Sequence, residues 1–593
     1  MINRTTKLRW RRRFKRSQRQ VESFSIQAEQ GVEKHFFKRL NKLTDVRRFV
    51  TAWVLLIILI GAGLVVQVRA LSPYYQTVEP IEGGIYTEGI LGGFTTSNPM
   101  YATSSVDSSV SRLLFNGLMK YNSKNELGLD LAQSIEENAT SDVYTVKLKN
   151  NIYWHDGQPI DAEDVVFTYS SIQNPDSKSP LRANWQKIEI EQVDSSTVRF
   201  KLPHPLSSFP HLMTNGIVPE HILSSVPISQ LRNVDFNTTK PVGSGPFKWD
   251  SIQVNGQNPQ LREEQIGLRP YEDYHLGEPK IDRMIIKSIH DEQNLIKQYK
   301  DQTIDAIAGL NSIPEELVNN QVIDYNFPLN AEVMTFFKLS NDVLADQTVR
   351  QALTRSVNRT EILKVLGYPV IPVQSPLLRA HLGFSEDSIQ LGYDIGEANR
   401  LLDEGGWVKG SDGIRQKDNK KLAFQLYSHD NVEYSRIADV LKRQWEQIGA
   451  KVDVVLQDDT QIQSTIALHN YDALLYGISV GGDPDVYAYW HSTQADARSS
   501  NRLNFSELKS DVVDNALEAG RSRSDAATRE VKYTPFLAEW QKLAPAVGLY
   551  QPRFLYVTRN NVYGLNEAVL NNSSDRFSNV HNWRIKTGRV TIQ

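Results

Sequence analysis

The hydropathy pattern is dominated by one unbroken apolar run near the N-terminus. It extends from Phe49 to Val66, with Thr51 as its single polar interruption and no charge. Continued as a helix to Arg69, at about 1.5 Å per residue, it would span about 30 Å, the thickness of a bilayer's hydrocarbon core. A helix of a soluble domain normally keeps one polar face, and this one has none. The pattern predicts a transmembrane helix over residues 49–69.

The charges on either side of the apolar run predict its orientation. Residues 1–48 are densely basic, whereas Glu79, Glu82 and Glu88 follow the lone Arg69. Because Lys and Arg are retained on the cytoplasmic side, we expect a single-pass protein of the cell membrane with a cytoplasmic N-terminus and an extracytoplasmic main domain. The basic segment is interpreted as binding anionic lipid headgroups, with contact to nucleic acid or the ribosome as the alternative.

A cleaved secretory signal is the competing interpretation of the apolar run. The tripeptide Val68-Arg69-Ala70 loosely fits a small-residue cleavage site. The long basic lead and an apolar run longer than the usual ~7–15 residues favour a retained anchor. The chain contains no cysteine, which excludes a lipid-modified N-terminal Cys and all disulfides. A large domain can form its core without disulfides.

Strand and helix periodicities alternate after the apolar run. Residues 144–149 alternate apolar and polar side chains, which predicts a half-buried strand. Apolar residues at helical spacing follow potential N-caps, which predicts amphipathic helices after Asp161, Asp346 and Asp394 and over residues 437–448. A strand over 451–456 follows the last of these helices. Helices that alternate with strands indicate an α/β lobe with a largely parallel sheet.

Length, composition and charge restrict the class of protein. The chain has 593 residues, 40% of them apolar and 23% charged, which is typical of a globular protein. At about 100–200 residues per domain, the part beyond the first ~70 residues forms two or three lobes. The formal net charge is -3, so the part after the basic segment is acidic. An acidic external domain is a poor candidate for binding nucleic acid.

The sequence contains no recognisable catalytic motif. There is no cysteine nucleophile, no H-E-x-x-H, no G-x-S-x-G and no Gly-Lys-[Ser/Thr] phosphate loop. His204 and His211 lie among prolines and do not share a helical face for a metal. His155 and Asp156 are interpreted as part of a turn. We therefore expect no enzyme activity, no metal site and no cofactor.

Four motifs resemble those of a known family. The stretch 152–172, IYWHDGQPIDAEDVVFTYSSI, resembles the signature region of the family 5 extracytoplasmic solute-binding proteins, the dipeptide- and oligopeptide-binding components of ABC importers. Residues 241–247 resemble the loop P-x-G-[ST]-G-P-[FY] of that family, and residues 269–282 and 346–359 resemble later segments in the same order. The resemblance implies a two-lobed α/β fold of the periplasmic-binding-protein type (type II, cluster C-like) with an extra subdomain.

The resemblance also implies how the chain is divided. Residues 76–330 together with 551–593 would form the first lobe, including an extra β-rich subdomain, and residues 331–550 the second. The chain would cross between the lobes near residues 328–333 and 549–552. Two such crossings make a hinge, and a ligand that touches both lobes would select the closed state.

By the same resemblance, the ligand lies between the lobes. The expected contacts from both lobes are Phe94, Thr95, Thr96, Ser97, Asn98, Ser479, Val480, Asp483 and Asp485. In peptide-binding members an Asp four residues before the proline of the second stretch pairs with the ligand's α-amine, and this chain has Val480 there. Valine cannot make that charge-assisted hydrogen bond, and an unpaired buried ammonium is costly.

Two explanations for Val480 stay open. Either Asp483 or Asp485 binds the amine from a shifted loop, or the ligand lacks a free amine and is an oligosaccharide, a blocked peptide or another solute. We expect a membrane-anchored receptor that captures a peptide-like solute and delivers it to ABC permease and ATPase subunits. The alternative on the same fold is a ligand sensor or scaffold with the basic segment as its output.

Overall fold

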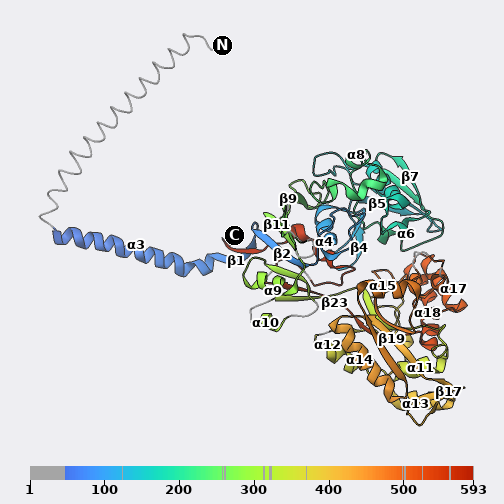
Figure 1. Cartoon of the computed structure of the whole chain (residues 1–593). Helices are drawn as coiled ribbons and strands as arrows, with labels where there is room; N and C mark the ends of the chain where they lie inside the picture. The colour runs from blue at the N-terminus through green and yellow to red at the C-terminus, as the bar shows by residue number, and fades with distance from the viewer. Residues whose placement is uncertain are drawn as a thin grey trace. The chain divides into compact units, whose positions relative to one another are not determined.

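The computed structural model describes residues 47–122, 124–256, 258, 262–310, 314–318, 323–368, 370–496, 498–499, 502–523, 525–559, 562–565 and 567–591. The basic segment up to residue 46 lies outside the described residues. The chain forms two compact units, which are Met1–Glu79 with Thr587–Gln593, and Pro80–Lys586. Figure 1 labels helices and strands of both units.

The first unit contains the apolar helix expected from the sequence. Helix α3 (Arg47–Tyr75) includes the 22 residues Phe49–Ala70, whose mean hydropathy is 2.8 and none of which is buried. By length and composition this helix is able to cross a membrane. Strand β1 (Gln76–Ile81) follows it directly and pairs with strand β24 (Lys586–Thr591).

The second unit begins with a seven-stranded sheet. Its strand order is β13 (Ile323–Pro328), β23 (Arg553–Thr558), β12 (Ala306–Leu310), β2 (Ile85–Leu91), β11 (Arg283–Ile289), β10 (Glu263–Pro270) and β9 (Phe247–Asn255). Strand β2 is parallel to β11 and β12, and the other pairs are antiparallel. Helices α4 (Ser105–Leu114) and α9 (Glu292–Lys300) pack against this sheet, which is the centre of the first lobe.

A four-stranded antiparallel sheet forms the β-rich part of the first lobe. Its strand order is β5 (Ala132–Glu137), β6 (Val143–Leu148), β8 (Thr197–Lys201) and β7 (Glu189–Asp194). The predicted alternation is confirmed in β6, where Tyr144, Val146 and Leu148 are buried. Helix α5 (Ala162–Gln173) begins at the predicted N-cap, and Asp161 and Asp164 form a complete capping box.

The second lobe is built on a six-stranded sheet. Its strand order is β15 (Ile371–Pro372), β22 (Ala546–Gln551), β14 (Ala331–Phe337), β21 (Ala473–Ser479), β19 (Ala423–His429) and β20 (Lys451–Gln457). Helices cover both faces; the longer ones are α11 (Gln347–Arg355), α13 (Ile395–Glu404), α14 (Val432–Gln447), α15 (Asp459–Leu468), α17 (Asp511–Arg521) and α18 (Ala526–Leu543). Side chains of β14 alternate between the two apolar cores on either side of the sheet.

The prediction of a largely parallel sheet is wrong for this lobe. Only β19 pairs in parallel, with β20 and β21, whereas β14 is antiparallel to both β21 and β22, and β15 is antiparallel to β22. The reason is the connection between the lobes. The chain enters the second sheet through β14 and leaves it through β22, so these adjacent strands run in opposite directions.

The two crossings between the lobes lie side by side. Strand β13 of the first sheet continues through Leu329 and Asn330 into β14 of the second, and β22 continues through Pro552 into β23. The Leu329 N–H donates to the Pro552 carbonyl at 2.9 Å, which joins the two crossings. The molecule therefore has the two-lobed α/β architecture expected, with paired connecting strands as its hinge.

Candidate functional site

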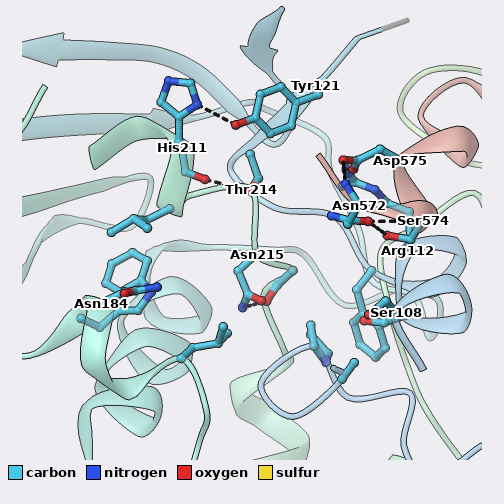
Figure 2. A pocket seen from close by; sticks show the side chains of 18 residues that line it. Ser108, Arg112, Tyr121, Asn184, His211, Thr214, Asn215, Asn572, Ser574 and Asp575 are labelled. Carbon is cyan, nitrogen blue, oxygen red and sulfur yellow. Dashed lines mark hydrogen bonds and ion pairs between the residues drawn. The ribbon is translucent and has the colours of Figure 1, made fainter. Parts of the chain in front are cut away.

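Two cavities lie where the lobes meet. The first-lobe cavity has a volume of about 260 Å³ and is lined by first-lobe residues, among them Arg112, Tyr121, Asn184, His211 and Asp575 (Figure 2). The interlobe cavity has a volume of about 690 Å³. It is lined by residues from both lobes, which are Asn184, Gln186, Ile188, Leu202, Pro203, His204, Pro205 and Leu206 of the first and Tyr487, Asn515, Glu518, Ala519, Arg521 and Ser522 of the second. Asn184 lines both cavities, so they adjoin.

An ion pair forms one wall of the first-lobe cavity. Arg112 on α4 donates from Nη2 to Asp575 Oδ1 at 2.5 Å, and Asp575 is positioned by a capping box with Asn572 at the short helix η8 (Ser573–Phe577). Burial alone would lower the pKa of Arg112, but the charge and hydrogen bond of Asp575 outweigh it and raise that pKa. The Arg112 guanidinium therefore stays charged, and its charge is paired with the Asp575 carboxylate.

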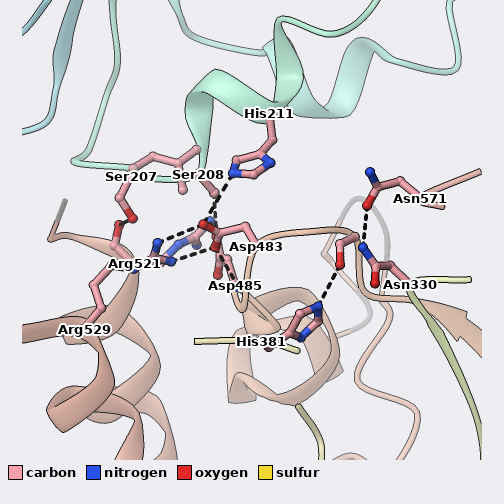
Figure 3. Close-up of polar contacts among 12 residues, drawn as sticks. Ser207, Ser208, His211, Asn330, His381, Asp483, Asp485, Arg521, Arg529 and Asn571 are labelled. Atoms are coloured by element: carbon pink, nitrogen blue, oxygen red, sulfur yellow. Dashed lines mark hydrogen bonds and ion pairs between the residues drawn. The ribbon is translucent and has the colours of Figure 1, made fainter. Parts of the chain in front are cut away.

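His211 connects this cavity to the second lobe. It lies in the short helix α7 (Phe209–Leu212), and its Nδ1 is 2.6 Å from the Tyr121 hydroxyl. Its Nε2 is 3.6 Å from Asp483 Oδ2 of the second lobe (Figure 3). Burial lowers the pKa of His211, which Asp483 only partly opposes, so the imidazole is neutral at pH 7. If the tyrosine donates to Nδ1, the remaining proton on Nε2 faces Asp483.

Each carboxylate in the second-lobe loop is held by an arginine (Figure 3). Asp483 accepts two hydrogen bonds from Arg529 of α18, at 2.8 and 2.6 Å. Asp485 accepts from Arg521 at 3.1 Å and from the Ser208 hydroxyl of the first lobe at 3.0 Å. Burial would raise the pKa of Asp483, but Arg529 outweighs it and lowers that pKa. Both charges are thus neutralised within the protein.

The expected first-lobe contacts, Phe94, Thr95, Thr96, Ser97 and Asn98, form a tightly bonded loop. The Asp107 carboxylate accepts from the Thr95 and Thr96 N–H groups at 2.7 and 3.1 Å and from the Thr95 hydroxyl at 2.5 Å. The Asn98 side chain donates to that of Asn237 at 3.0 Å, and the Ser97 hydroxyl donates to the Asn237 carbonyl at 3.0 Å.

This loop lies beside the first-lobe cavity. The five residues themselves are not among the residues that line either cavity, but Pro99, which follows directly, and Ala102 line the first. Their contact with a ligand therefore stays a prediction.

The expected second-lobe contacts differ in accessibility. Ser479 is exposed and its carbonyl accepts from the Tyr489 hydroxyl at 2.6 Å. Val480 is buried in the core that contains Val486 and Trp490, and its N–H donates to the Asn330 carbonyl at the hinge at 2.9 Å. Asp483 and Asp485 are the members of this set that reach the first lobe.

The sequence reasoning missed most of the charged residues of the site. Arg112, Arg521, Arg529 and Asp575 bind partners that lie far away along the chain, and no local pattern distinguishes them from surface charges. The aromatic residue Tyr487 lines the interlobe cavity. Its ring is stacked on His491 at 4.1 Å, and the Arg521 guanidinium lies 4.1 Å from its centroid.

His155 has a structural role. The Gly243 N–H donates to its Nδ1 at 3.2 Å, and its Nε2 lies 2.9 Å from the Gly245 carbonyl, so the imidazole joins the turn to the loop 241–247. Burial lowers its pKa to about 4. Asp156 is paired with His221 at 2.9 Å. Among the residues that the structure describes, no group of three or more His, Asp or Glu side chains could hold a metal ion.

Comparisons with known proteins agree with this architecture. The family described as bacterial extracellular solute-binding proteins, family 5, matches residues 126–500. The oligopeptide-binding protein AppA of Bacillus subtilis (strain 168) is 29% identical over 499 residues, which cover 82% of this chain and 89% of that protein.

Two solved structures are also similar. AppA of Bacillus subtilis in complex with a nonapeptide superposes with a TM-score of 0.68 at 27% identity, covering 86% of this chain and 100% of that one. NikZ of Campylobacter jejuni in complex with Ni(L-His) superposes with a TM-score of 0.70 at 25% identity, covering 84% of this chain and 99% of that one.

Proposed function

Because the chain belongs to family 5 of the bacterial extracellular solute-binding proteins, we propose that it captures a peptide-like solute between its lobes and delivers it to the permease of an ABC importer. The observation that carries the proposal is the pair of adjoining cavities at the junction of the lobes. The relative AppA is named for oligopeptide binding, and its structure holds a nonapeptide. A peptide is therefore the first choice of ligand.

A solute other than a peptide is the second candidate. Asp483 and Asp485 are each paired with an arginine, so neither offers an unpaired carboxylate to a ligand's amine. The similar protein NikZ holds Ni(L-His) in the corresponding fold. A ligand without a free amine at the second lobe fits this arrangement best.

The apolar helix is proposed to be a retained anchor. Its 22 predominantly apolar residues Phe49–Ala70, none of them buried, are enough to cross a bilayer once, with the basic segment in the cytoplasm and the lobes outside. In this proposal the lobes are residues 76–330 with 551–593 and residues 331–550. The expected contacts Phe94–Asn98, Ser479, Val480, Asp483 and Asp485 border the ligand when the lobes close around it.

In this proposal, closure of the lobes depends on the direct contacts between them and on the ligand that bridges them. The lobes touch through Ser207, whose N–H and hydroxyl donate to the Arg521 carbonyl at 2.9 and 3.1 Å, and through Ser208 and His211. Each such hydrogen bond contributes about 0.5–1.5 kcal/mol net. Contacts this weak leave the lobes free to open, so a ligand that bridges them shifts the population toward the closed state.

The test is ligand-dependent stabilisation of the full-length protein in detergent micelles. A ligand at 100 times its Kd raises the free energy of unfolding by about 2.7 kcal/mol, which a thermal melt detects. We expect at least one pool of nine-residue peptides to raise Tm. If peptide pools, oligosaccharides and amino acid complexes all leave Tm unchanged, the proposal is wrong. Proteolysis of intact cells, which reaches only external lobes, tests the topology separately.

A further inference from the structure

Two carboxamides face the interlobe cavity from opposite lobes. Asn184 lies in the short helix α6 (Arg182–Trp185) of the first lobe, and Asn515 lies on α17 of the second. Both side chains are exposed, and neither makes a hydrogen bond to another residue in the described part of the chain. Asn184 also lines the first-lobe cavity, where it lies on the side opposite Arg112 and Asp575 (Figure 2).

The arginines around these carboxamides are already paired. Arg521 of the interlobe cavity is bound to Asp485, and Arg112 of the first-lobe cavity is bound to Asp575. The acid of the interlobe wall, Glu518, is 59% exposed and lies 3.3 Å from His491 Nε2. A ligand carboxylate that entered this space would lose its hydration and meet the Glu518 carboxylate without gaining an unpaired guanidinium, which is costly.

The rest of the first-lobe wall is largely apolar and aliphatic. Its apolar members are Ile188, Leu202, Pro203, Pro205 and Leu206, and its polar members are Gln186 and the exposed His204. The Tyr487 ring is covered by His491 and by Arg521, so its faces are not free to stack on a ligand. Aliphatic walls with a few polar groups suit apolar side chains attached to a hydrogen-bonding backbone.

We propose that Asn184 and Asn515 are specificity-determining residues that bind an apolar internal segment of a peptide, one without acidic side chains, from opposite sides. A carboxamide both donates and accepts hydrogen bonds, so it matches the N–H and C=O of a peptide backbone, whereas it cannot compensate an ammonium or a carboxylate. The charged termini of the peptide lie outside the interlobe cavity. This inference rests on the proposed function and adds the chemical class of the bound segment.

The test compares two pools of nine-residue peptides with the same free termini and the full-length protein in detergent micelles. One pool has Val, Leu or Ala at its three central positions, and the other has Asp or Glu there. We expect the apolar pool to bind at least tenfold more tightly, because a buried unpaired charge costs more than 1.4 kcal/mol. Equal or tighter binding of the charged pool would overturn the inference.

The variants Asn184→Ala and Asn515→Ala locate the effect. Each should weaken binding of the apolar pool about 5- to 10-fold by loss of hydrogen bonds, with an unchanged Tm of the ligand-free protein because neither side chain has a partner to lose. The matched control is Asn233→Ala, an exposed asparagine that lines neither cavity, which should leave affinity unchanged.

The outcomes separate this inference from the proposed function. Affinity that is unchanged in both variants, or stabilisation by oligosaccharides alone, would refute the role of the two carboxamides while solute binding stands. If no peptide or oligosaccharide pool binds, the proposed function fails, and the inference that depends on it fails too.

Discussion

The ion pair between Arg529 and Asp483 allows a quantitative test of how the second-lobe loop is stabilised. The guanidinium donates two hydrogen bonds to the carboxylate and a third, from Nε, to the Gly520 carbonyl at 3.1 Å. The side chains are only 8% and 11% exposed. The variant Arg529→Ala removes the counter-charge and leaves Asp483 with the Asp485 N–H at 2.9 Å and His211 nearby.

We expect this variant to lose about 3 kcal/mol in free energy of unfolding. Breaking a buried pair by removing one partner costs about 3–5 kcal/mol, because the other charge is left uncompensated. The lower end of this energy range applies here, because His211 can take up a proton and replace part of the positive charge lost with Arg529. Removal of Arg529 therefore also raises the pKa of His211, and the loss in stability is smaller at pH 5.5 than at pH 8.

Urea denaturation of the full-length protein in micelles measures the difference. In the double variant Asp483→Asn with Arg529→Met, both charges are absent, so part of the lost stability should return. Arg498→Ala serves as the control, because Arg498 forms an ion pair with Asp496 but is 90% exposed, and its loss should leave the free energy of unfolding nearly unchanged. A loss below about 1 kcal/mol in Arg529→Ala, or a double variant no more stable than Arg529→Ala, would refute the reasoning.

Three further predictions concern buried groups. A Cβ at Gly243 would lie 1.8 Å from the Leu114 carbonyl oxygen, so Gly243→Ala should lower the free energy of unfolding, measured in urea, by several kcal/mol. The control is Gly157→Ala, where no atom lies within 4 Å of the added Cβ but φ is positive, and it should cost about 1 kcal/mol. Burial raises the pKa of the unpartnered Glu332 carboxyl, so the free energy of unfolding of the wild type should decrease as pH rises above about 4.5. Glu332→Gln should remove this pH dependence. A variant whose free energy of unfolding has the same slope between pH 5 and 8 as the wild type would contradict the prediction. Burial lowers the pKa of His155 to about 4, so the contribution of its neutral imidazole to the free energy of unfolding is complete above pH ~6.5 and is lost toward pH 4. We expect the free energy of unfolding to decrease by about 3 kcal/mol over this pH range. His155→Asn should abolish the decrease.

Local signals in the sequence were sufficient for the elements. The apolar helix, the alternation in β6 and the capping box of Asp161 depend on residues that are neighbours along the chain, so each could be predicted without the fold. The antiparallel orientation of β14 and β22 could not be predicted in this way, because it depends on where the chain passes between the lobes.

The site depended on contacts that no local pattern encodes. Asp483 was expected as a possible partner of a ligand's amine, but its partner is Arg529, 46 residues further along the chain. Arg112 and Asp575 are separated by 463 residues. Pairs of this kind appear only when distant helices pack together, so the sequence indicated the acids of the site without indicating that they are already neutralised.

The position of β23 within the first sheet affects how the protein is made. This strand lies between β13 and β12, and its residues 553–558 come after those of every strand of the second lobe. While the ribosome is still adding the intervening residues, β12 keeps an open edge and β13 has no neighbour in the sheet. The lobe that begins first is therefore completed last, and its unpaired edges are the part of the nascent chain that most needs protection from aggregation.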